Sequence, residues 1–464
     1  MSKLSGLVSL GLEETGDADY WDLYGFEGLT TLAALPQLEE LSLYDATSEH
    51  LLGIAELPGL AVLRLEGSDL SDPAGILSLA RLNELEELSI TGGVSDGLAP
   101  VVASLPGLLA LELSYGRMTG AALPQLAGLT GLVSLTLRAN QLTNASLPEL
   151  ARLQRLVALD LGANWSIDDA GLEPLARLPE LASLHLDATG VTDAGLPAIA
   201  RLPELRHLDL SATTLSDAGL ASLGSLSQLE VLELRRTGIS DAAMPTLAQL
   251  THLRLLDLGE NHSITGNGLS LLAALPELQT LHLDETALTD DALEALAAFP
   301  ALVSLDLDTT RISACAIPSL AQIRTLRTLS LEDTALPYWA EVELRTALPY
   351  CDVSYGYTPD RWGVETASCE AAGEGTDEGS DETASDGEDE GSLPSITGIP
   401  DCEHYLDRVE ATCNCGVVAK SIVLRPAFEA VPAAVAVVAP ELLAEACRQG
   451  TQTLERDFGL AGCW

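Results

Sequence analysis

Residues 181–204 read LASLHLDATGVTDAGLPAIARLPE, and similar stretches fill most of the chain. The first six letters follow the pattern LxxLxL, in which leucines alternate with other residues as in a strand with one buried face. The remainder resembles LSDAGLASLGSLSQ (215–228) and LTDDALEALAAFPA (288–301), and reads as a turn followed by a short helix. The chain therefore alternates short strands with short helices.

The strand pattern recurs so evenly that the chain reads as a stack of similar coils. It begins at Leu7, Leu38, Leu60, Leu85, Leu108, Leu132, Leu156, Leu181, Leu205, Leu229, Leu253, Leu278, Leu302 and Leu326. After the first of these fourteen units, the spacing of consecutive starts is nearly constant at about 24 residues, the length of one small supersecondary unit. Because one coil cannot bury its own leucines, each coil depends on its neighbours for stability.

Each coil also carries turn and cap signals. A Thr or Asn three residues after the strand is expected to bond to the backbone where the chain turns. The residues concerned are Asn140, Thr189, Thr213, Thr237, Thr286, Thr310 and Thr334. Pairs such as Thr192-Asp193 are expected to cap the following helix, with the Asp charge favourable at its positive end. The proline of ARLPE then ends that helix.

These repeats resemble the leucine-rich repeat family, in particular the 24-residue ribonuclease-inhibitor-like or GALA-type subclass. The resemblance covers roughly residues 1–355. It implies an α/β fold, a right-handed solenoid (horseshoe) of about 14 coils with a parallel concave sheet and convex helices. It also implies a role as an inhibitor, a receptor or a substrate adaptor. The F-box that GALA-type adaptors carry is not recognisable in this sequence.

The charge of the chain excludes several partners. The formal net charge is −46, from 69 acidic and 23 basic residues, while 47% of residues are hydrophobic. The high apolar content argues against a fully disordered acidic protein. A field of this sign repels phosphate groups, so we expect no binding of nucleic acid or anionic lipid.

No segment reads as a membrane span or as a signal peptide. The most apolar stretch, residues 417–440, is interrupted by charges and prolines, and its clean part is about half the ~20 residues that a bilayer requires. The N-terminal MSKLSGLVSLGL runs straight into repeat sequence. A further coil and a leader are therefore expected upstream of this start, or the first edge of the solenoid is exposed.

The composition changes sharply after the repeats. We expect a solenoid with end caps over 1–368, an acidic disordered linker over 369–399 and a small helical module over 400–464. Aromatic residues, including Trp339, Tyr350 and Tyr355, gather at the end of the solenoid and are expected to cap its core, the alternative being a ligand-binding aromatic insertion. The module resembles four-cysteine helical modules appended to bacterial exported proteins.

The cysteines allow more than one interpretation. A helical hairpin would bring together Cys402 with Cys463 and Cys413 with Cys447, and a unit this small needs such staples. Free thiols and a metal site remain alternatives, although a C-x-C spacing at Cys413 is unusual for zinc. Elsewhere, Cys315 is expected to be a buried core thiol, and Cys351 and Cys369 could staple the C-terminal cap.

The residue between the last two leucines of each strand should point out of the concave face. From Leu108 onward this position holds Glu112, Thr136, Asp160, His185, Asp209, Glu233, Asp257, His282, Asp306 and Ser330. Two residues later stand Asp187, Asp284, Asp308 and Glu332, and Arg235 lies beside them. Each ladder histidine lies between two aspartates, which should favour its charged form. The pattern indicates either a solvated face balanced by cross-strand pairs or an acidic surface that docks a basic protein. A separate Asp–His–Asp metal site at each histidine is a weaker possibility.

Function is therefore predicted to be non-enzymatic protein binding through the concave face, with no cofactor and no metal. An open sheet offers no pocket, oxyanion hole or exclusion of water for catalysis. One hypothesis is an exported or surface-attached binder with a disulfide-bonded module. The other is a cytoplasmic scaffold or ubiquitin-ligase-adaptor-like substrate receptor whose C-terminal cysteines are reduced or bind a metal. A count of free thiols separates the two.

Overall fold

The structure is a computed structural model that describes residues 8–12, 37–57, 59–67, 70 and 73–356. The chain divides into two units, Met1–Gly363 and Val364–Trp464. The predicted linker (369–399), the predicted helical module (400–464) and the cysteines Cys402, Cys413, Cys447 and Cys463 lie outside the described residues. They stay predictions.

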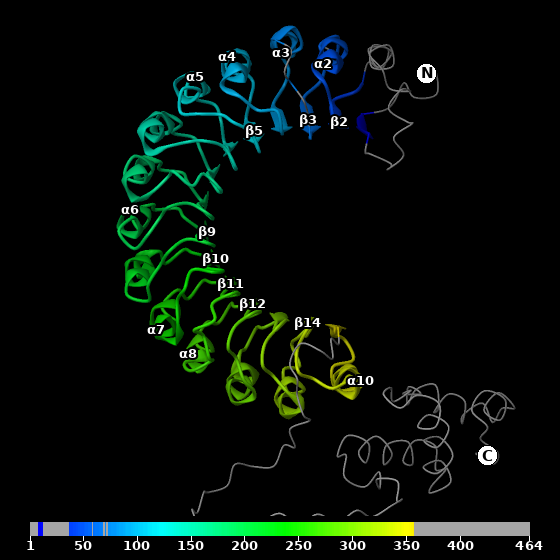
Figure 1. Cartoon of the computed structure of the whole chain (residues 1–464), viewed down its shortest axis with the longest axis vertical. Helices are drawn as coiled ribbons and strands as arrows, with labels where there is room; N and C mark the ends of the chain where they lie inside the picture. Colours follow the sequence, from blue (N-terminus) through cyan, green and yellow to red (C-terminus); the bar gives the residue numbers. More distant parts are fainter. Residues whose placement is uncertain (1–7, 13–36, 58, 68–69, 71–72, 357–464) are drawn as a thin grey trace, which may run out of the picture. The chain divides into compact units, whose positions relative to one another are not determined.

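The described part of the first unit is a curved stack of coils with one parallel sheet on its inner side (Figure 1). All 15 strands lie in sequence order, each hydrogen-bonded to the next. They are β1 (Ser9–Leu12), β2 (Glu40–Tyr44), β3 (Val62–Glu66), β4 (Glu87–Thr91), β5 (Ala110–Ser114), β6 (Ser134–Thr136), β7 (Ala158–Asp160), β8 (Ser183–His185), β9 (His207–Asp209), β10 (Val231–Glu233), β11 (Leu255–Asp257), β12 (Thr280–His282), β13 (Ser304–Asp306), β14 (Thr328–Ser330) and β15 (Asp352–Ser354). The predicted horseshoe solenoid with an open parallel sheet is confirmed.

The leucines of LxxLxL form one continuous core between the sheet and the outer layer. In the coil of β8, Leu181, Leu184 and Leu186 are each fully buried. The strands pair without a register shift, so Leu184 lies between Leu159 and Leu208. Each layer of leucines is therefore closed by the layers on both sides, as expected when the coils cannot fold singly.

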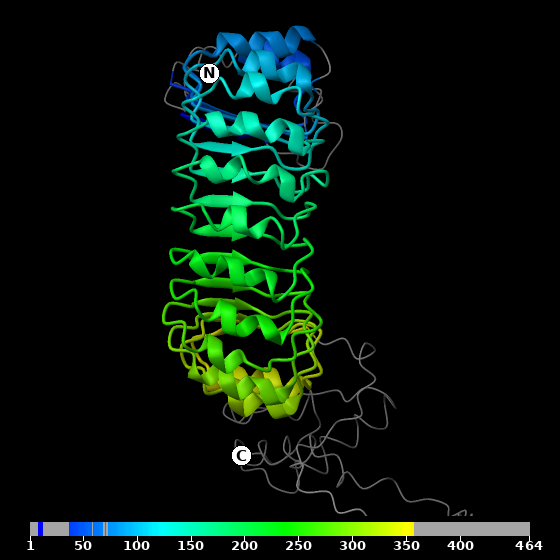
Figure 2. The same ribbon diagram turned by 90° about the vertical axis from the view of Figure 1, so that its left-hand side faces the viewer.

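The convex side carries short helices, as the sequence predicts (Figure 2). The α-helices are α2 (Ser48–Ile54), α3 (Pro73–Ser78), α4 (Ala99–Val102), α5 (Leu123–Leu126), α6 (Leu196–Ile199), α7 (Met244–Leu247), α8 (Leu269–Leu272), α9 (Ile317–Leu320) and α10 (Tyr338–Ala347). The 3-10 segments are Leu79–Arg81, Asp96–Leu98, Asn144–Arg152, Asp169–Gly171, Leu175–Arg177, Gly219–Ser225, Asp241–Ala243, Asp290–Ala298 and Ala314–Ala316. A coil this short must also supply a strand and two turns, which leaves room for at most about three helical turns.

The predicted hydrogen bonds at the turns after the strands are present, and two further residues make the same kind of bond. The Thr hydroxyls donate to the carbonyl three residues back, as Thr189 Oγ1 does to Leu186 O at 2.6 Å. Asn164 and Asn261, which the sequence analysis did not single out, occupy the same position and are fully buried. Their amides also reach the neighbouring coil, since Asn164 Nδ2 donates to Leu137 O at 3.0 Å.

The aspartates of the Thr-Asp and Ser-Asp pairs do not act mainly as helix caps. Asp193 instead accepts two hydrogen bonds from the next coil, from Ser216 N at 2.8 Å and from the Ser216 hydroxyl. Asp169 binds Thr192, and Asp290 binds Ser313, in the same way. These carboxylates therefore tie coil to coil along the ascending loops, and part of the chain's negative charge is structural.

A fifteenth coil closes the described part of the solenoid, and the leucine pattern did not reveal it. Leu348, Cys351 and Val353 take the three leucine positions and are buried. Cys351 is a free thiol in the core, so the predicted Cys351–Cys369 staple is wrong, and burial raises the pKa of this thiol. Cys315 was also assigned wrongly, because it is half-buried and disulfide-bonded rather than a buried thiol.

The predicted aromatic cap is confirmed for two residues. Trp339 and Tyr355 pack against the core, and Tyr355 donates its hydroxyl hydrogen to Leu336 O at 2.7 Å. Tyr350, by contrast, is 81% exposed and caps nothing. Within the described residues, no helix combines the length and the apolar character that crossing a bilayer requires.

Candidate functional site

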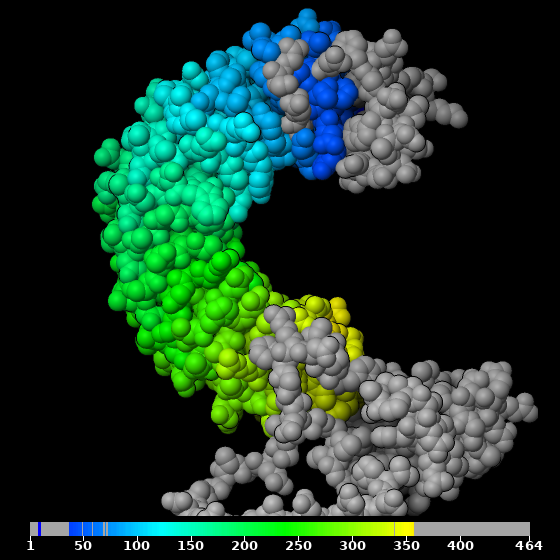
Figure 3. Space-filling model, in the orientation of Figure 1, coloured from blue at the N-terminus to red at the C-terminus, as the bar shows by residue number. Residues whose placement is uncertain are grey.

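The acidic ladder predicted for the concave face is present and in register. Cα pairing runs unbroken from Glu112 through Thr136, Asp160, His185, Asp209, Glu233, Asp257, His282 and Asp306 to Ser330. We call this row the concave ladder; it lies on the hollow side of the arc in Figure 3. Glu112 stands apart from the acids further along, because it accepts a hydrogen bond from Ser89 Oγ at 2.7 Å and has Thr136 as its next neighbour.

A second row, two residues after the concave ladder, contains two long-range ion pairs. Arg138 holds Asp187 through two hydrogen bonds of 2.6 Å. Arg235 holds Asp284 in the same way, with 2.9 Å to Oδ1 and 2.6 Å to Oδ2. Asp187 and Asp284 are only 7% and 6% exposed. Since their charge is already satisfied, these two predicted contact residues are poor candidates for direct binding.

Both ion pairs skip one coil, and a glycine in that coil makes this possible. At Gly162, an added Cβ would lie 2.3 Å from Asp187 Oδ1 and 2.4 Å from Arg138 Nη1. At Gly259, it would lie 2.4 Å from Arg235 Nη1 and 2.6 Å from Asp284 Oδ1. The arginine therefore crosses directly above the glycine of the intervening strand to reach its partner.

The ladder histidines pair with aspartates on one side only. His185 Nδ1 lies 3.7 Å from Asp209, and His282 Nδ1 lies 3.6 Å from Asp257. These carboxylates raise the pKa of both imidazoles against the opposing effect of burial. His207, absent from the predicted set, packs edge-on against His185 at 4.4 Å and contacts Glu233 at 2.8 Å. The middle of the face is therefore largely balanced by its own cations.

The C-terminal end of the ladder lacks this balance. Among the described residues, Asp306, Asp308 and Glu332 form no ion pair with a basic side chain. Burial, together with the neighbouring carboxylates Asp308 and Asp284, raises the pKa of Asp306 to about 6. The pKa of Asp308 is raised as well, chiefly by burial. A cation placed here would relieve an electrostatic cost that the fold itself leaves in place.

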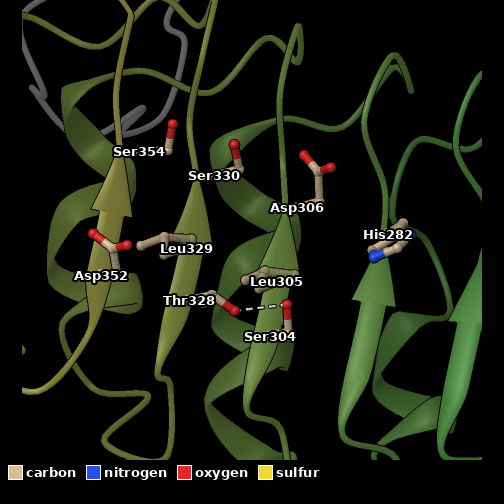
Figure 4. Close-up of a pocket in the computed structure, with 9 residues that line it drawn as sticks. All are labelled: His282, Ser304, Leu305, Asp306, Thr328, Leu329, Ser330, Asp352 and Ser354. Atoms are coloured by element: carbon tan, nitrogen blue, oxygen red, sulfur yellow. Dashed lines mark hydrogen bonds between the residues drawn. The ribbon is translucent and has the colours of Figure 1, made fainter. Parts of the chain in front are cut away.

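A small open pocket lies at this end, between β12 and β15 (Figure 4). It is lined by His282, Ser304, Leu305, Asp306, Thr328, Leu329, Ser330, Asp352 and Ser354. Its volume is about 170 Å³, below the ~300 Å³ at which small-molecule sites begin. The size suits a single protruding side chain, and the hydroxyls and carboxylates suit a basic one.

The twelve predicted contact residues thus fall into two groups. Asp187, Asp209, Asp257 and Asp284 are at least nine-tenths buried and already paired. Glu112, Asp160, His185, Glu233, Arg235, His282, Asp306 and Asp308 keep partly exposed side chains on the concave face. Arg138 was not predicted as a site residue, although it occupies the same position after its strand as Arg235 does after β10. The pocket hydroxyls were not predicted either, because serine and threonine in a strand give no distinct signal.

The ladder histidines do not form a metal site with the described residues around them. Within the described residues, no group of three or more His, Cys, Asp or Glu side chains is arranged to hold a metal ion. Among the described residues, only one of the two flanking aspartates forms an ion pair with each ladder histidine, so the three side chains do not converge on one point.

Stability should depend on pH through these groups. A pKa raised in the folded state stabilises the fold at low pH, and that stability is lost as pH rises through the folded pKa. We therefore expect the Tm to be higher at pH 6 than at pH 8, by on the order of 2 °C, through His185 and His282. Asp306 should add to the effect between about pH 6 and pH 4. Thermal unfolding followed by circular dichroism measures this.

The matched variants are H185Q/H282Q and, as control, H262Q. His262 is exposed on a loop, where its ring contacts Glu285 O at 2.7 Å, away from the concave ladder. The double variant should lose most of the rise in Tm between pH 8 and pH 6, and the control should keep it. An unchanged pH profile in the double variant would contradict the assignment.

Comparison with known proteins supports the repeat architecture. Residues 153–176, 202–224 and 249–273 match the family model described as Leucine Rich repeat. Similar solved structures include an internalin (inlF) from Listeria monocytogenes, at 21% identity over 74% of this chain and 96% of that chain, with a TM-score of 0.45. A leucine-rich-repeat protein from Leptospira interrogans is 19% identical over 76% of this chain and 98% of that chain, with a TM-score of 0.49. No curated protein sequence matches the chain. The chain thus contains leucine-rich repeats in a solenoid fold, while the subclass stays a prediction.

Proposed function

We propose that this leucine-rich-repeat solenoid binds a basic protein through the C-terminal half of its concave face. Solenoids of this kind are in general protein-interaction modules with extended concave surfaces. The observation that carries the proposal is the unbalanced group of Asp306, Asp308 and Glu332, of which Asp306 lines the small pocket. A lysine or arginine side chain of the partner would enter the pocket and lie against Asp306.

Charge on the rest of the face supports the same partner. Arginines and histidines balance much of the ladder, so the C-terminal end becomes the preferred site for an incoming cation. Acidic clustering of this kind speeds encounter with a basic partner and makes binding sensitive to salt. Of the two cellular locations considered, the disulfide at Cys315 favours export, because disulfide bonds persist in oxidising compartments.

The proposal predicts that D306N/D308N weakens binding of a fluorescent hexa-arginine peptide at least tenfold in 50 mM salt. Both substitutions keep an oxygen acceptor for the backbone N–H groups of Asp308 and Glu332, so the turns are preserved. Fluorescence anisotropy with the full-length chain at 50 and 300 mM salt gives the affinities. The wild-type affinity should fall steeply with salt, and it should also fall below pH 6 as Asp306 becomes protonated.

The control for non-specific attraction is E84Q/E204Q. Glu84 and Glu204 are exposed and lie outside the concave ladder, so the change in net charge is the same. If this control weakens binding as much as D306N/D308N does, the attraction comes from overall charge and the proposed site is wrong.

A further inference from the structure

Six residues on or directly after β6 to β9 recur on or directly after β10 to β13, 97 positions later. The matching pairs are Arg138 and Arg235, Asp160 and Asp257, Gly162 and Gly259, His185 and His282, Asp187 and Asp284, and Asp209 and Asp306. We call the members from β6 to β9 the first subsite and those from β10 to β13 the second subsite. The two subsites lie four strands apart in one sheet.

The core does not require these residues. The strands that flank the two subsites pair just as well with other side chains, such as Glu112 in β5 and Ser330 in β14. Exposed positions outside the concave face also differ between the two halves of the repeat. Glu173 becomes Ser270, Arg177 becomes Ala274 and Trp165 becomes His262. The six matching pairs are therefore not imposed by the core, and they recur although a neighbouring concave position differs, with Thr136 in one half and Glu233 in the other.

The two subsites also share their construction. In each, an arginine crosses a glycine to hold an aspartate two coils away, through two nitrogen–oxygen contacts of 2.6 to 2.9 Å. In each, a histidine stands between two ladder aspartates. Each subsite contains three aspartates against one arginine and one titratable imidazole, so it keeps a net negative charge even though several of its aspartates are paired within the subsite. Such a site is complementary to a cationic group.

One difference between the subsites has a visible cause. His185 turns towards Asp209, on the C-terminal side, and His282 turns towards Asp257, on the N-terminal side. The ring of His207 lies against His185, whereas the second subsite has Ser304 at that position. The two subsites therefore share the same residues, but their histidines pair with different aspartates.

We propose that the two subsites bind equivalent cationic groups, and that the partner is a protein carrying two basic clusters at the same separation as the subsites. This inference rests on the proposed function and adds the number of basic clusters through which the partner binds. Four strand spacings of ~4.8 Å place the subsite centres about 19 Å apart. An extended segment lying along the concave face would bridge that distance with about six residues at ~3.3 Å each.

Tandem peptides test the inference on the full-length chain. The probes are a single tri-arginine cluster and two such clusters joined by a Gly-Ser linker, which is short in one tandem and long in the other. With a long linker of about 12 residues the two cluster centres are about 15 residues apart and have an average separation of about 21 Å, whereas a short linker of about one residue leaves the centres about four residues apart and lets them reach only about 13 Å. We expect two single clusters to bind per chain, and the long-linker tandem to bind at least tenfold more tightly than the single cluster or the short-linker tandem.

Variants of each subsite decide whether both take part. D160N/D209N and D257N/D306N should each reduce the affinity of the long-linker tandem to that of the single cluster. Asparagine keeps the acceptor that each aspartate offers to the backbone N–H two residues on, at 2.8 to 3.0 Å. The E84Q/E204Q control should keep the full gain.

The outcomes distinguish a failure of the two-subsite inference from a failure of the proposed function. If the single cluster binds in a salt-sensitive manner but the long-linker tandem gains nothing, the two-subsite inference is overturned and the proposed function stands. The same holds if the gain survives in either double variant. If the single cluster shows no salt-sensitive binding to the wild-type chain, the proposed function itself is overturned.

Discussion

Replacement of Asn261 by alanine is expected to lower the free energy of unfolding by about 3 kcal/mol. The Asn261 side chain is fully buried and satisfies backbone groups of two coils at once. Its amide donates to Leu234 O and Leu258 O at 2.8 and 2.9 Å, and its oxygen accepts from Gly238 N at 2.8 Å. Alanine would leave these buried groups without partners, and an unsatisfied buried group costs about 1–3 kcal/mol.

The control for this prediction is T310V. Thr310 holds the equivalent position in the coil of β13 and makes one hydrogen bond, to Leu307 O at 2.6 Å. Valine keeps its shape, so a loss of only about 1 kcal/mol is expected. Urea denaturation measures both variants, and hydrogen exchange should place the damage of N261A in the coils of β10 to β12. Equal losses in the two variants would show that the asparagine has no special role.

Replacement of Gly75 by alanine is expected to cost about 3 kcal/mol, although only one methyl group is added. Gly75 lies in α3 and is buried against the neighbouring coil. Its Cβ would lie 2.0 Å from Ser48 O and 2.6 Å from Ser48 C, at the start of α2. Because these are backbone atoms, the two helices must move apart, and the leucine layers beneath them would lose contact.

The matched control here is G59A. Nothing lies within 4 Å of a Cβ at Gly59, so alanine should be tolerated or should stabilise slightly by restricting the unfolded chain. Thermal and urea unfolding of the two variants provide the comparison. A G75A protein as stable as G59A would mean that α2 and α3 pack less closely than the structure has them.

Most of the fold could be predicted because its information is local and repeated. The same spacing of leucines recurs in each coil, and the period of two within LxxLxL assigns every strand residue to the core or to the concave face. Thr189 and its equivalents bond to the backbone as expected because the turn lies three residues from its own strand. The fifteenth strand escaped prediction because Cys351 and Val353 replace leucine there.

The row of residues that forms the candidate site could be predicted, but the ion pairs between their side chains could not. Register alone brings Asp160, His185 and Asp209 side by side. Nothing in the spacing says that Arg138 reaches over Gly162 to Asp187, two coils away. The choice of partner depends on side-chain length and on the open space above a glycine, which are properties of the assembled sheet.

The sequence by itself therefore determined the solenoid, the order and register of its strands, and which side chains line the concave face. A short, regular leucine repeat permits one stacking, because every coil must bury its leucines against the next. Only the tertiary structure decided which of the acids are free to act. Burial and ion pairing occupy Asp187 and Asp284, while Asp306 is left beside a pocket without a basic partner among the described residues. The sequence gives the number of acidic residues, but the distances between side chains of neighbouring coils decide which carboxylates can bind a partner.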